Sequence, residues 1–275
     1  MSSVAELLSQ AREAALEDAP LLLAHVLDKD RSWLLAWPEY QLQPSELRQY
    51  EQLLKRRQQG EPLAYLTGRK EFWSVELEVS PDVLIPRPET ELLVAQALEL
   101  GLPDQTRILE LGTGSGAIAI ALGGERPDWT ITATDISSAA LDIARKNILK
   151  QGRSNIRLAQ GHWYEAVPHG HKYQLILSNP PYVAADDPHL LEDGLPWEPP
   201  QALGAGSDGL ADLRTIISAA PAHLLPAGWL LVEHGFDQGR AVRKLFTKAG
   251  FTRVLTRRDL GGQDRVTLGC YPPSS

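Results

Sequence analysis

The amino-terminal part of the chain has hydrophobic residues at helical spacing and no alternating strand pattern. Near the start they recur three and four positions apart, at Leu7, Leu8, Ala11, Ala14 and Ala15. The apolar stretches APLLLAHVLDKD and SWLLAW predict two more helices, and residues 45–59 predict a long polar helix that Gly60 can end. We therefore predict a small helical domain over residues 1–70, without a catalytic motif of its own.

A proline-rich segment separates this helical part from the rest of the chain. The alternating sequence FWSVELEV, residues 72–79, predicts a strand. The sequence SPDVLIPRPET follows it, and its prolines predict a fixed loop rather than a helix interior. These prolines are Pro81, Pro86 and Pro88. A helix should begin near Glu89, so we assign residues 71–88 to a linker of hairpin and loop and residues 89–275 to a second domain.

From Thr106 onwards, apolar strand patterns alternate with amphipathic helix patterns. The predicted strands are RILELG, TITATD, IRLAQG, YQLILS, GWLLVEHG, FTRVLTRRDL and RVTLGCY. Repeated strand–helix units indicate an α/β fold of the Rossmann-like type, with helices on both faces of a parallel sheet. No helix pattern separates the last two strands, so a seven-stranded, mostly parallel sheet should end in an antiparallel hairpin. Ligands of such sheets bind at the carboxyl ends of the strands, where functional residues are therefore expected.

Composition and charge narrow the classes of function. The 275-residue chain has a formal net charge of −8, whereas proteins that hold nucleic acid by its phosphates usually carry a basic surplus. No apolar run approaches the ~18 residues of a membrane-spanning helix, and the amino terminus lacks the basic start and apolar core of a secretory signal. Cys270 is the sole cysteine, so no intrachain disulfide can form. We expect a cytoplasmic protein that binds neither membranes nor nucleic acid directly.

A glycine-rich turn follows the first strand of the predicted sheet. Its residues are Gly112, Thr113, Gly114, Ser115 and Gly116. Glycine at alternate positions permits a tight turn from strand to helix and a close approach of a ligand to the backbone. Ala117 also completes a loose dinucleotide-binding pattern. The turn alone leaves two cofactors open, a nicotinamide dinucleotide and S-adenosylmethionine.

Asp135 ends the second strand and is the expected ligand of a ribose. A carboxylate at this position accepts hydrogen bonds from ribose hydroxyls, and it serves either cofactor. The alternative is that Asp135 caps the next helix, whose start is otherwise marked by Ser137 or Ser138. The acid therefore indicates an adenosyl ligand without choosing between the two cofactors.

The sequence Asn179-Pro180-Pro181-Tyr182 follows the fourth strand and distinguishes the two cofactors. Two consecutive prolines cannot extend a central strand, so they fix the backbone. The Asn179 side-chain oxygen and the Pro180 carbonyl can each accept one N–H of an NH₂ group, which aims the nitrogen lone pair at a sulfonium methyl group. Tyr182 offers an aromatic face to a flat acceptor. We predict methyl transfer from S-adenosylmethionine to a planar amide or amine nitrogen, by positioning and without a metal.

Beyond these motifs, nearly the whole chain resembles the bacterial release-factor glutamine methyltransferases of the PrmC/HemK family. The stretches that carry the resemblance are GEPLAYLTG, EFW, LIPRPETE, ILELGTGSGAIAIAL, ATDIS, SNPPY, DPHL, WEPPQAL, DGL, LLVEHG and DRVTLG. The resemblance implies a class I methyltransferase fold and a glutamine acceptor in the Gly-Gly-Gln motif of peptide-chain release factors. It implies N5-methylglutamine and S-adenosylhomocysteine as products, and we expect a monomer.

The resemblance also implies roles for individual residues. It places S-adenosylmethionine against residues 112–116, Asp135 and Asn179, with Trp163 beside the adenine. The residues that would hold the glutamine amide are Asn179, Pro180, Pro181 and Tyr182, of which Asn179, Pro180 and Tyr182 are the expected catalytic residues. The helical domain would bind the release factor. Arg87, beside the expected acceptor pocket, either shapes substrate entry or pairs with Glu89.

Three other signals have simpler explanations. The Gly-Gly-Gln at 261–263 lies between the last two strands, where a hairpin turn is needed. His169 and His171 lack further ligands at metal-binding spacing and are expected in a solvated loop. Trp33 and Trp37 are expected in the core rather than on a binding platform.

Three competing functions stay open at this point. A nucleic-acid methyltransferase for adenine N6 or guanine N2 would use the same geometry on a base flipped out of its stack, and the net charge argues against it. A nicotinamide oxidoreductase would explain the glycine turn and Asp135 but gives residues 179–182 no role. A binding module on an inactive methyltransferase fold is disfavoured by the complete set of motifs.

Overall fold

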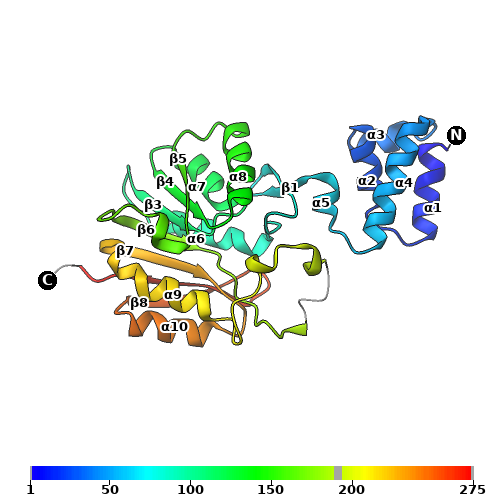
Figure 1. Ribbon diagram of the computed structural model, residues 1–275. Coiled ribbons are helices and arrows are strands. Elements are labelled where there is room, and N and C mark those ends of the chain that lie inside the picture. The colour runs from blue at the N-terminus through cyan, green and yellow to red at the C-terminus, as the bar shows by residue number, and fades with distance from the viewer. Residues whose placement is uncertain (1, 189–193, 274–275) are drawn as a thin grey trace. The chain divides into compact units, whose positions relative to one another are not determined.

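The structure, a computed structural model, describes residues 2–188 and 194–273 and divides into two compact units, Met1–Arg69 and Lys70–Ser275. The last two residues of the DPHL stretch lie outside the described residues. In the first unit the helices are α1 Val4–Glu13, α2 Ala19–Leu27, α3 Arg31–Ala36, α4 Pro44–Gln58 and α5 Leu63–Thr67 (Figure 1). The predicted helical amino-terminal region is thus confirmed. The short helix α5 was not predicted, and it ends at Gly68, whose φ is 69°.

Local chemistry fixes the helix ends of the first unit. The Ser3 hydroxyl accepts the backbone N–H of Glu6, and the Glu6 carboxylate accepts the N–H of Ser3 at 2.8 Å, so α1 begins with a capping box. Gly60, with a φ of 94°, follows the end of α4 as predicted. The core of this unit is formed by buried residues that include Leu7, Leu22, Leu23, Leu34 and Leu53.

The two tryptophans of α3 differ in burial. Trp33 packs partly buried against the core of the first unit, whereas Trp37 is 53% exposed. The prediction that both lie in the core is therefore wrong for Trp37. The reason is that α3 ends at Ala36, so Trp37 no longer follows the helical periodicity on which the prediction rested.

A tight hairpin opens the second unit, and the prediction of one strand over residues 72–79 is wrong. Strands β1 Arg69–Phe72 and β2 Val75–Glu78 are joined by Trp73 and Ser74, whose φ angles are 50° and 58°. Positive φ at both central residues is typical of a type I′ turn, which reverses the chain without interrupting the alternation of side chains. Trp73 is held in this turn by its backbone N–H, which donates to Glu91 Oε1 at 2.8 Å.

The main sheet has seven strands in the order β5-β4-β3-β6-β7-β9-β8, which confirms the predicted fold. The strands are β3 Arg107–Leu111, β4 Thr130–Asp135, β5 Ile156–Gln160, β6 Tyr173–Ser178, β7 Leu224–Glu233, β8 Thr252–Arg258 and β9 Asp264–Cys270. β9 is antiparallel to both of its neighbours, and the pairs from β5 to β7 are parallel. Gly262, with a φ of 78°, lies in the turn between β8 and β9, so the turn interpretation of residues 261–263 is confirmed.

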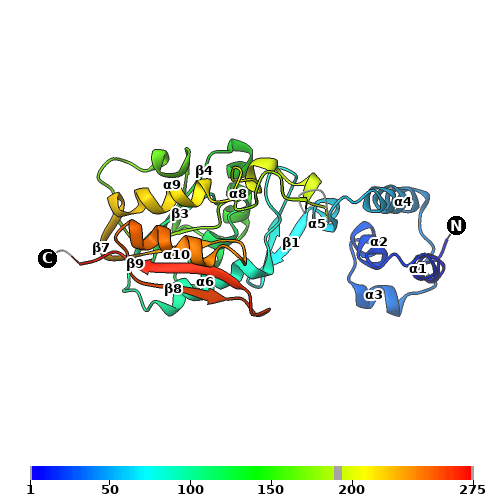
Figure 2. The same cartoon turned by 90° about the horizontal axis from the view of Figure 1, so that it is seen from below.

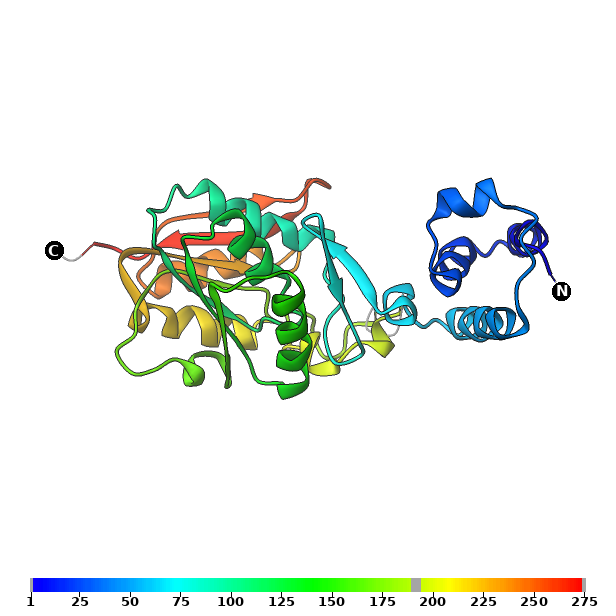
Figure 3. The ribbon, with the colours of Figure 1, turned by 90° about the horizontal axis from the view of Figure 1, so that it is seen from above.

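Helices cover both faces of this sheet (Figures 2 and 3). The helices of the second unit are α6 Glu91–Glu99, α7 Ala117–Glu125, α8 Ser138–Lys150, α9 Ala211–Ala219 and α10 Gly239–Lys248, with short 3-10 helices η1 Pro88–Thr90, η2 Trp163–Ala166, η4 Leu195–Trp197, η5 Pro200–Ala202 and η6 Ala220–Ala222. Leu175 and Leu177 of β6 share a buried cluster with α6 and α7. Ile176, between them, belongs to the opposite cluster with α9 and α10. This alternation divides the core into two layers, as strand geometry requires.

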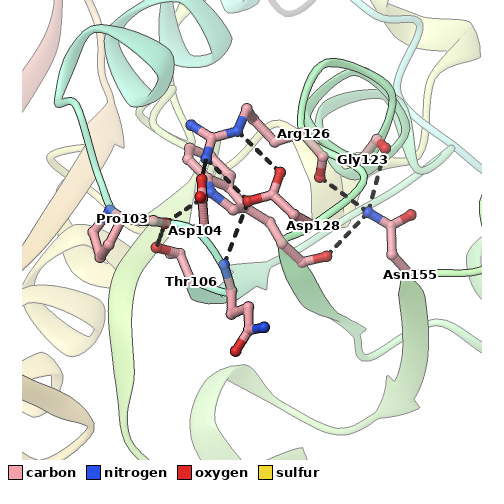
Figure 4. Close-up of polar contacts among 9 residues, drawn as sticks. Pro103, Asp104, Thr106, Gly123, Arg126, Asp128 and Asn155 are labelled. Atoms are coloured by element: carbon pink, nitrogen blue, oxygen red, sulfur yellow. Dashed lines mark hydrogen bonds and ion pairs between the residues drawn. The ribbon is translucent and has the colours of Figure 1, made fainter.

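A polar cluster anchors the amino ends of β3 and β4, at the edge opposite to the carboxyl ends of the strands (Figure 4). Arg126 Nη2 pairs with Asp104 at 2.9 Å and with Asp128 at 3.0 Å. Asn155 Nδ2 lies within hydrogen-bond distance of the carbonyls of Gly123, Arg126 and Trp129, the shortest contact being 3.0 Å to Trp129. These contacts tie the end of α7 to the start of β4, and they leave the opposite edge of the sheet free for a ligand.

Candidate active site

A pocket lies at the carboxyl ends of β3, β4, β5 and β6, where the sequence predicts it. The predicted site residues that line it are Arg87, Gly112, Thr113, Gly114, Ser115, Asp135, Trp163, Asn179 and Pro181. Three other predicted residues are not part of the lining: Gly116 caps α7, Pro180 is buried, and Tyr182 turns its hydroxyl to Glu233. The fold therefore brings most of the predicted cofactor and acceptor residues to one cavity.

The glycine turn has the tight backbone that the sequence predicts. Gly112 and Gly114 have φ angles of 71° and 55°, which disfavour residues with a Cβ atom. A Cβ atom at Gly112 would lie 3.4 Å from the Trp163 ring, whereas nothing lies within 4 Å of one built at Gly114. The turn is tied to β4 because the N–H of Thr113 donates to the Thr134 carbonyl at 2.9 Å. A ligand can therefore approach the backbone closely at Gly114.

Asp135 holds the end of β4 to the glycine turn. Its Oδ2 accepts the N–H of Gly114 and its Oδ1 accepts the N–H of Ser137, both at 2.9 Å. The cap of α8 is Ser137, whose hydroxyl accepts the N–H of Ala140 at 3.1 Å, so the alternative that Asp135 is the helix cap is wrong. Burial raises the pKa of Asp135, although these backbone hydrogen bonds oppose the shift. Each carboxylate oxygen keeps further acceptor capacity for a ligand of the pocket.

Trp163 forms a flat wall of the pocket next to the glycine turn. Its φ is 47°, an uncommon value for a residue with a large side chain, and η2 begins with it. Its indole Nε1 is buried and has no hydrogen-bond partner of ordinary geometry among the residues that the structure describes, although the indole lies close enough to Asp212 to oppose the rise that burial causes in the pKa of that carboxyl group. Asp212, in the first turn of α9, also lines the pocket, and burial raises its pKa. This wall combines an aromatic face with a carboxyl group.

The side chain of Asn179 is oriented by a threonine from the proline-rich loop. Asn179 Nδ2 donates a hydrogen bond to Thr90 Oγ1 at 3.0 Å. Thr90 is 4% exposed and ends η1. Because the NH₂ branch of the amide is directed at Thr90, the oxygen branch of Asn179 is the one left to accept a hydrogen bond. Asn179 was predicted from the sequence but Thr90 was not, because their contact spans 89 positions of the chain.

Tyr182 is held by a buried carboxyl group that the sequence analysis also missed. Its hydroxyl donates to Glu233 Oε1 at 3.1 Å, and its backbone carbonyl accepts from Gln238 Nε2 at 2.9 Å. Glu233 ends β7 and is fully buried. Burial raises the pKa of Glu233 to about 7, although the Thr90 and Tyr182 hydroxyls and Arg265 oppose the shift. The sequence feature that could have identified Glu233 is an acidic residue directly after the apolar run WLLV.

Glu110 is a second buried acid, at the end of β3. It is 1% exposed, and neither carboxyl oxygen has a hydrogen-bond partner of ordinary geometry in the described part of the chain. Burial raises the pKa of Glu110 to about 8. Like Glu233, it interrupts an apolar strand that ends at the pocket, and that interruption is the signal that could have found it.

Arg87 pairs with Glu198, so the alternative that Arg87 pairs with Glu89 is wrong. The guanidinium donates to Glu198 Oε1, and Glu198 Oε2 accepts the backbone N–H of Ile85 at 3.0 Å. Glu198 is 3% exposed and lies between η4 and η5. One buried carboxylate therefore joins the proline-rich loop to a loop more than a hundred residues away in sequence.

His169 and His171 are both exposed on a loop, as predicted. Across residues 2–188 and 194–273, no group of three or more His, Cys, Asp or Glu side chains could hold a metal ion. In the same residues, no helix has the length and apolar character needed to cross a membrane.

Known proteins match both parts of the chain. Residues 1–68 match the model of the PrmC N-terminal domain, and residues 88–192 match that of the methyltransferase small domain. A release factor glutamine methyltransferase of Xylella fastidiosa is 49% identical over 93% of this chain and 93% of its own length. The Escherichia coli protein of that name is 48% identical over 95% of this chain and 94% of its own length.

A solved structure supports the fold independently of these names. A methyltransferase from Pyrococcus furiosus superimposes with a TM-score of 0.55 at 19% identity, over 79% of this chain and 97% of that one. At this identity the match concerns the fold alone. The two relatives, in contrast, are similar over nearly their whole length, so the chain belongs to the family of release factor glutamine methyltransferases.

Proposed function

We propose that this chain transfers a methyl group from S-adenosylmethionine to the side-chain nitrogen N5 of the glutamine in the Gly-Gly-Gln motif of peptide-chain release factors. The observation that carries the proposal is the hydrogen bond from Asn179 Nδ2 to Thr90 Oγ1, on the wall of the pocket. It leaves the Asn179 oxygen to accept an N–H of an incoming amide. The choice of a release-factor glutamine as the acceptor is supported by the two relatives, since both are called release factor glutamine methyltransferases.

S-Adenosylmethionine fits the residues that line the pocket. The open space over Gly114 accommodates a ligand against the backbone. Asp135 is half-buried in the lining with acceptor capacity to spare, as two ribose hydroxyls require. Trp163 offers a flat face to the adenine, and Asn179 also contacts the cofactor. When bound, S-adenosylmethionine supplies the electrophilic methyl group, and S-adenosylhomocysteine remains after transfer.

The residues of the 179–182 turn orient the acceptor. An amide nitrogen is a poor nucleophile because its lone pair is delocalised into the carbonyl group. Asn179 Oδ1 and the Pro180 carbonyl each accept one N–H, which orients the lone pair, and such positioning contributes several kcal/mol, up to about 7–11. Pro181 fixes the backbone. Tyr182, which is not part of the pocket lining, packs against the buried cluster of α9 and α10 and donates its hydroxyl to Glu233, so it anchors the turn rather than facing the amide. No residue removes the proton first, since it leaves to water after the transfer.

Different segments of the chain carry out catalysis and substrate binding in the proposed function. Residues 89–275 carry the chemistry, residues 71–88 link the parts, and residues 1–70 bind the release factor. We propose that the protein acts as a monomer in the cytoplasm, where release factors work, and without direct contact to nucleic acid. The net charge of −8 supports the last point.

The test offers labelled S-adenosylmethionine to the purified chain with three acceptors in parallel. These are a release factor, the same factor with alanine in place of the motif glutamine, and total RNA. Label in the intact release factor alone is expected. Label in RNA alone would identify the chain as a nucleic-acid methyltransferase instead. Asn179→Ala should lower the rate more than about tenfold with an unchanged melting temperature, whereas Asp142→Asn, an exposed change on α8, should keep the rate.

A further inference from the structure

A chain of polar groups runs from the pocket wall into the core beneath it. It starts at Asn179, whose NH₂ group donates to the hydroxyl of Thr90 at 3.0 Å. The Thr90 hydroxyl lies close enough to the carboxyl group of Glu233 to oppose the rise of its pKa, although the two groups form no hydrogen bond of ordinary geometry. Glu233 Oε1 accepts the hydroxyl of Tyr182 at 3.1 Å. One buried carboxyl group therefore lies beside both the residue that orients Asn179 and the tyrosine three positions after Asn179.

The surroundings of Glu233 leave little that could compensate its charge. Its side chain is fully buried, and Oε2 has no hydrogen-bond partner of ordinary geometry within the described residues. The charged and titratable groups that act on it are Tyr182 after β6, Arg265 on β9 and Glu89 in η1. A buried carboxyl group of this kind exchanges its proton in the neutral range, and burial raises the pKa of Glu233 to about 7.

We propose that Glu233 is a positioning residue that acts through Thr90 to keep the oxygen of Asn179 turned toward the acceptor. The proposal deepens the proposed function, because it rests on the role of Asn179 in holding an amide NH₂ group. It assigns Glu233 no contact with the acceptor or the cofactor.

The count of protons explains how the orientation depends on Glu233. Thr90 has one hydroxyl proton, and in the proposed arrangement it is accepted by Oε2 of an ionised Glu233, which is unpartnered among the described residues. The oxygen of Thr90 can then only accept from Asn179, so the NH₂ group of Asn179 turns inward and its oxygen outward. A protonated Glu233 can instead donate to Thr90, which frees the threonine proton for the Asn179 oxygen. The amide then flips and presents NH₂ to an acceptor that is itself an NH₂ group, so binding fails.

The direction of the pH dependence follows from this count. The productive orientation requires the ionised carboxylate, which predominates above the pKa of Glu233. The turnover number should therefore rise with pH through about 7 and level off above it. Glu233→Gln places a neutral group that donates an N–H at the same position, so it imitates the protonated state at every pH.

The experiment measures kcat for methylation of a release factor at saturating S-adenosylmethionine from about pH 5 to pH 9. Glu233→Gln should give a flat profile at the low level that the unchanged protein reaches in acid. Thr90→Val, which keeps the shape and removes the hydroxyl, should lose roughly tenfold to a hundredfold in kcat, and Thr90→Ser should restore it to within about threefold. Binding of S-adenosylhomocysteine should change far less than kcat in all variants, because the glycine turn, Asp135 and Trp163 are unaltered and only the contact with Asn179 is reoriented.

The outcomes separate the two proposals. If the unchanged protein labels no release factor, the proposed function fails and the role of Glu233 falls with it. If it does label the factor and Asn179→Ala abolishes the label, the proposed function stands. A wild-type rate and pH profile in Glu233→Gln or in Thr90→Val would then overturn the positioning role alone. Should Glu233→Gln fail to fold, the matched pair Thr90→Val and Thr90→Ser decides the question.

Discussion

Removing Arg87 should destabilise the second unit more than neutralising its partner Glu198, although the two side chains form one ion pair. The Glu198 side chain is 1% exposed and that of Arg87 is 35% exposed. Glu198 also accepts the N–H of Ile85 at 3.0 Å. Arg87→Ala therefore leaves the buried Glu198 carboxylate without a charged partner. Glu198→Gln, in contrast, keeps an acceptor for the Ile85 N–H and leaves a guanidinium group that is already partly hydrated.

These exposures set the size of the two effects. Removing one partner of a fully buried pair costs about 3–5 kcal/mol, and water that follows into the space left by Arg87 lowers this to about 2–3 kcal/mol. Glu198→Gln loses a pair that is open to solvent on one side, which is worth about 1 kcal/mol. Adding Glu198→Gln to Arg87→Ala removes the unpaired negative charge of Glu198, so the double variant should be about 1–2 kcal/mol more stable than Arg87→Ala alone.

The measurement is the urea midpoint of the full chain for the four members of this cycle, with the slope of each transition checked for constancy. The matched control is Arg145→Ala, which breaks an exposed pair with Asp142 and should cost no more than about 0.5 kcal/mol. The reasoning is refuted if Glu198→Gln destabilises as much as Arg87→Ala, or if the double variant shows the simple sum of both effects. Either result would mean that Glu198 is solvated in solution and that the two loops are not joined by a buried charge.

Three further substitutions separate stability from cofactor binding. Gly112→Ala strains a φ of 71° and adds a methyl group in contact with the Trp163 ring, so calorimetry should show roughly tenfold weaker binding of S-adenosylhomocysteine. Ser137→Ala removes the cap of α8 and should lower the free energy of unfolding by about 1 kcal/mol, with cofactor affinity within about threefold because Asp135 stays in place. Asn155→Ala removes the donor shared by three carbonyls and should cost about 1–3 kcal/mol in urea unfolding, with an unchanged KM for the cofactor. An intact affinity in the first variant or a lost one in the other two would contradict these assignments.

The strands of the sheet and most of the pocket follow from local patterns in the sequence. Each apolar run from RILEL to WLLVE becomes a strand, and the carboxyl ends of parallel strands meet at one edge, so residues that follow the strands converge there. This is why Asp135 and Asn179 could be placed in one pocket without knowledge of their contacts, whereas Trp163 was placed there by the family resemblance. The antiparallel end of the sheet followed from the missing helix between the last two strands.

The errors share a physical cause, which is that they depend on contacts or turns that periodicity does not encode. Trp73 and Ser74 turn the chain within an alternating pattern, because a type I′ turn of two residues preserves the alternation on either side. The partner of Arg87 lies 111 positions away, so proximity along the chain favoured Glu89. Thr90 and Glu233 were missed for the same reason, since each acts on the 179–182 turn from a distant segment.

In the proposed function, the 179–182 turn alone cannot select the acceptor. Two oxygen atoms that accept two N–H groups recognise an NH₂ group, which a glutamine amide shares with the amino group of adenine. Discrimination must therefore come from what surrounds that group. On one side this is the proline-rich loop, which supplies Thr90 to orient Asn179 and Arg87 to bind Glu198. Because Glu198 belongs to the loop around η4 and η5, one ion pair joins two segments that line the pocket. Residues of IPRPETE and of WEPPQAL line the same pocket, so we expect discrimination between a peptide and a base to depend on these two stretches together.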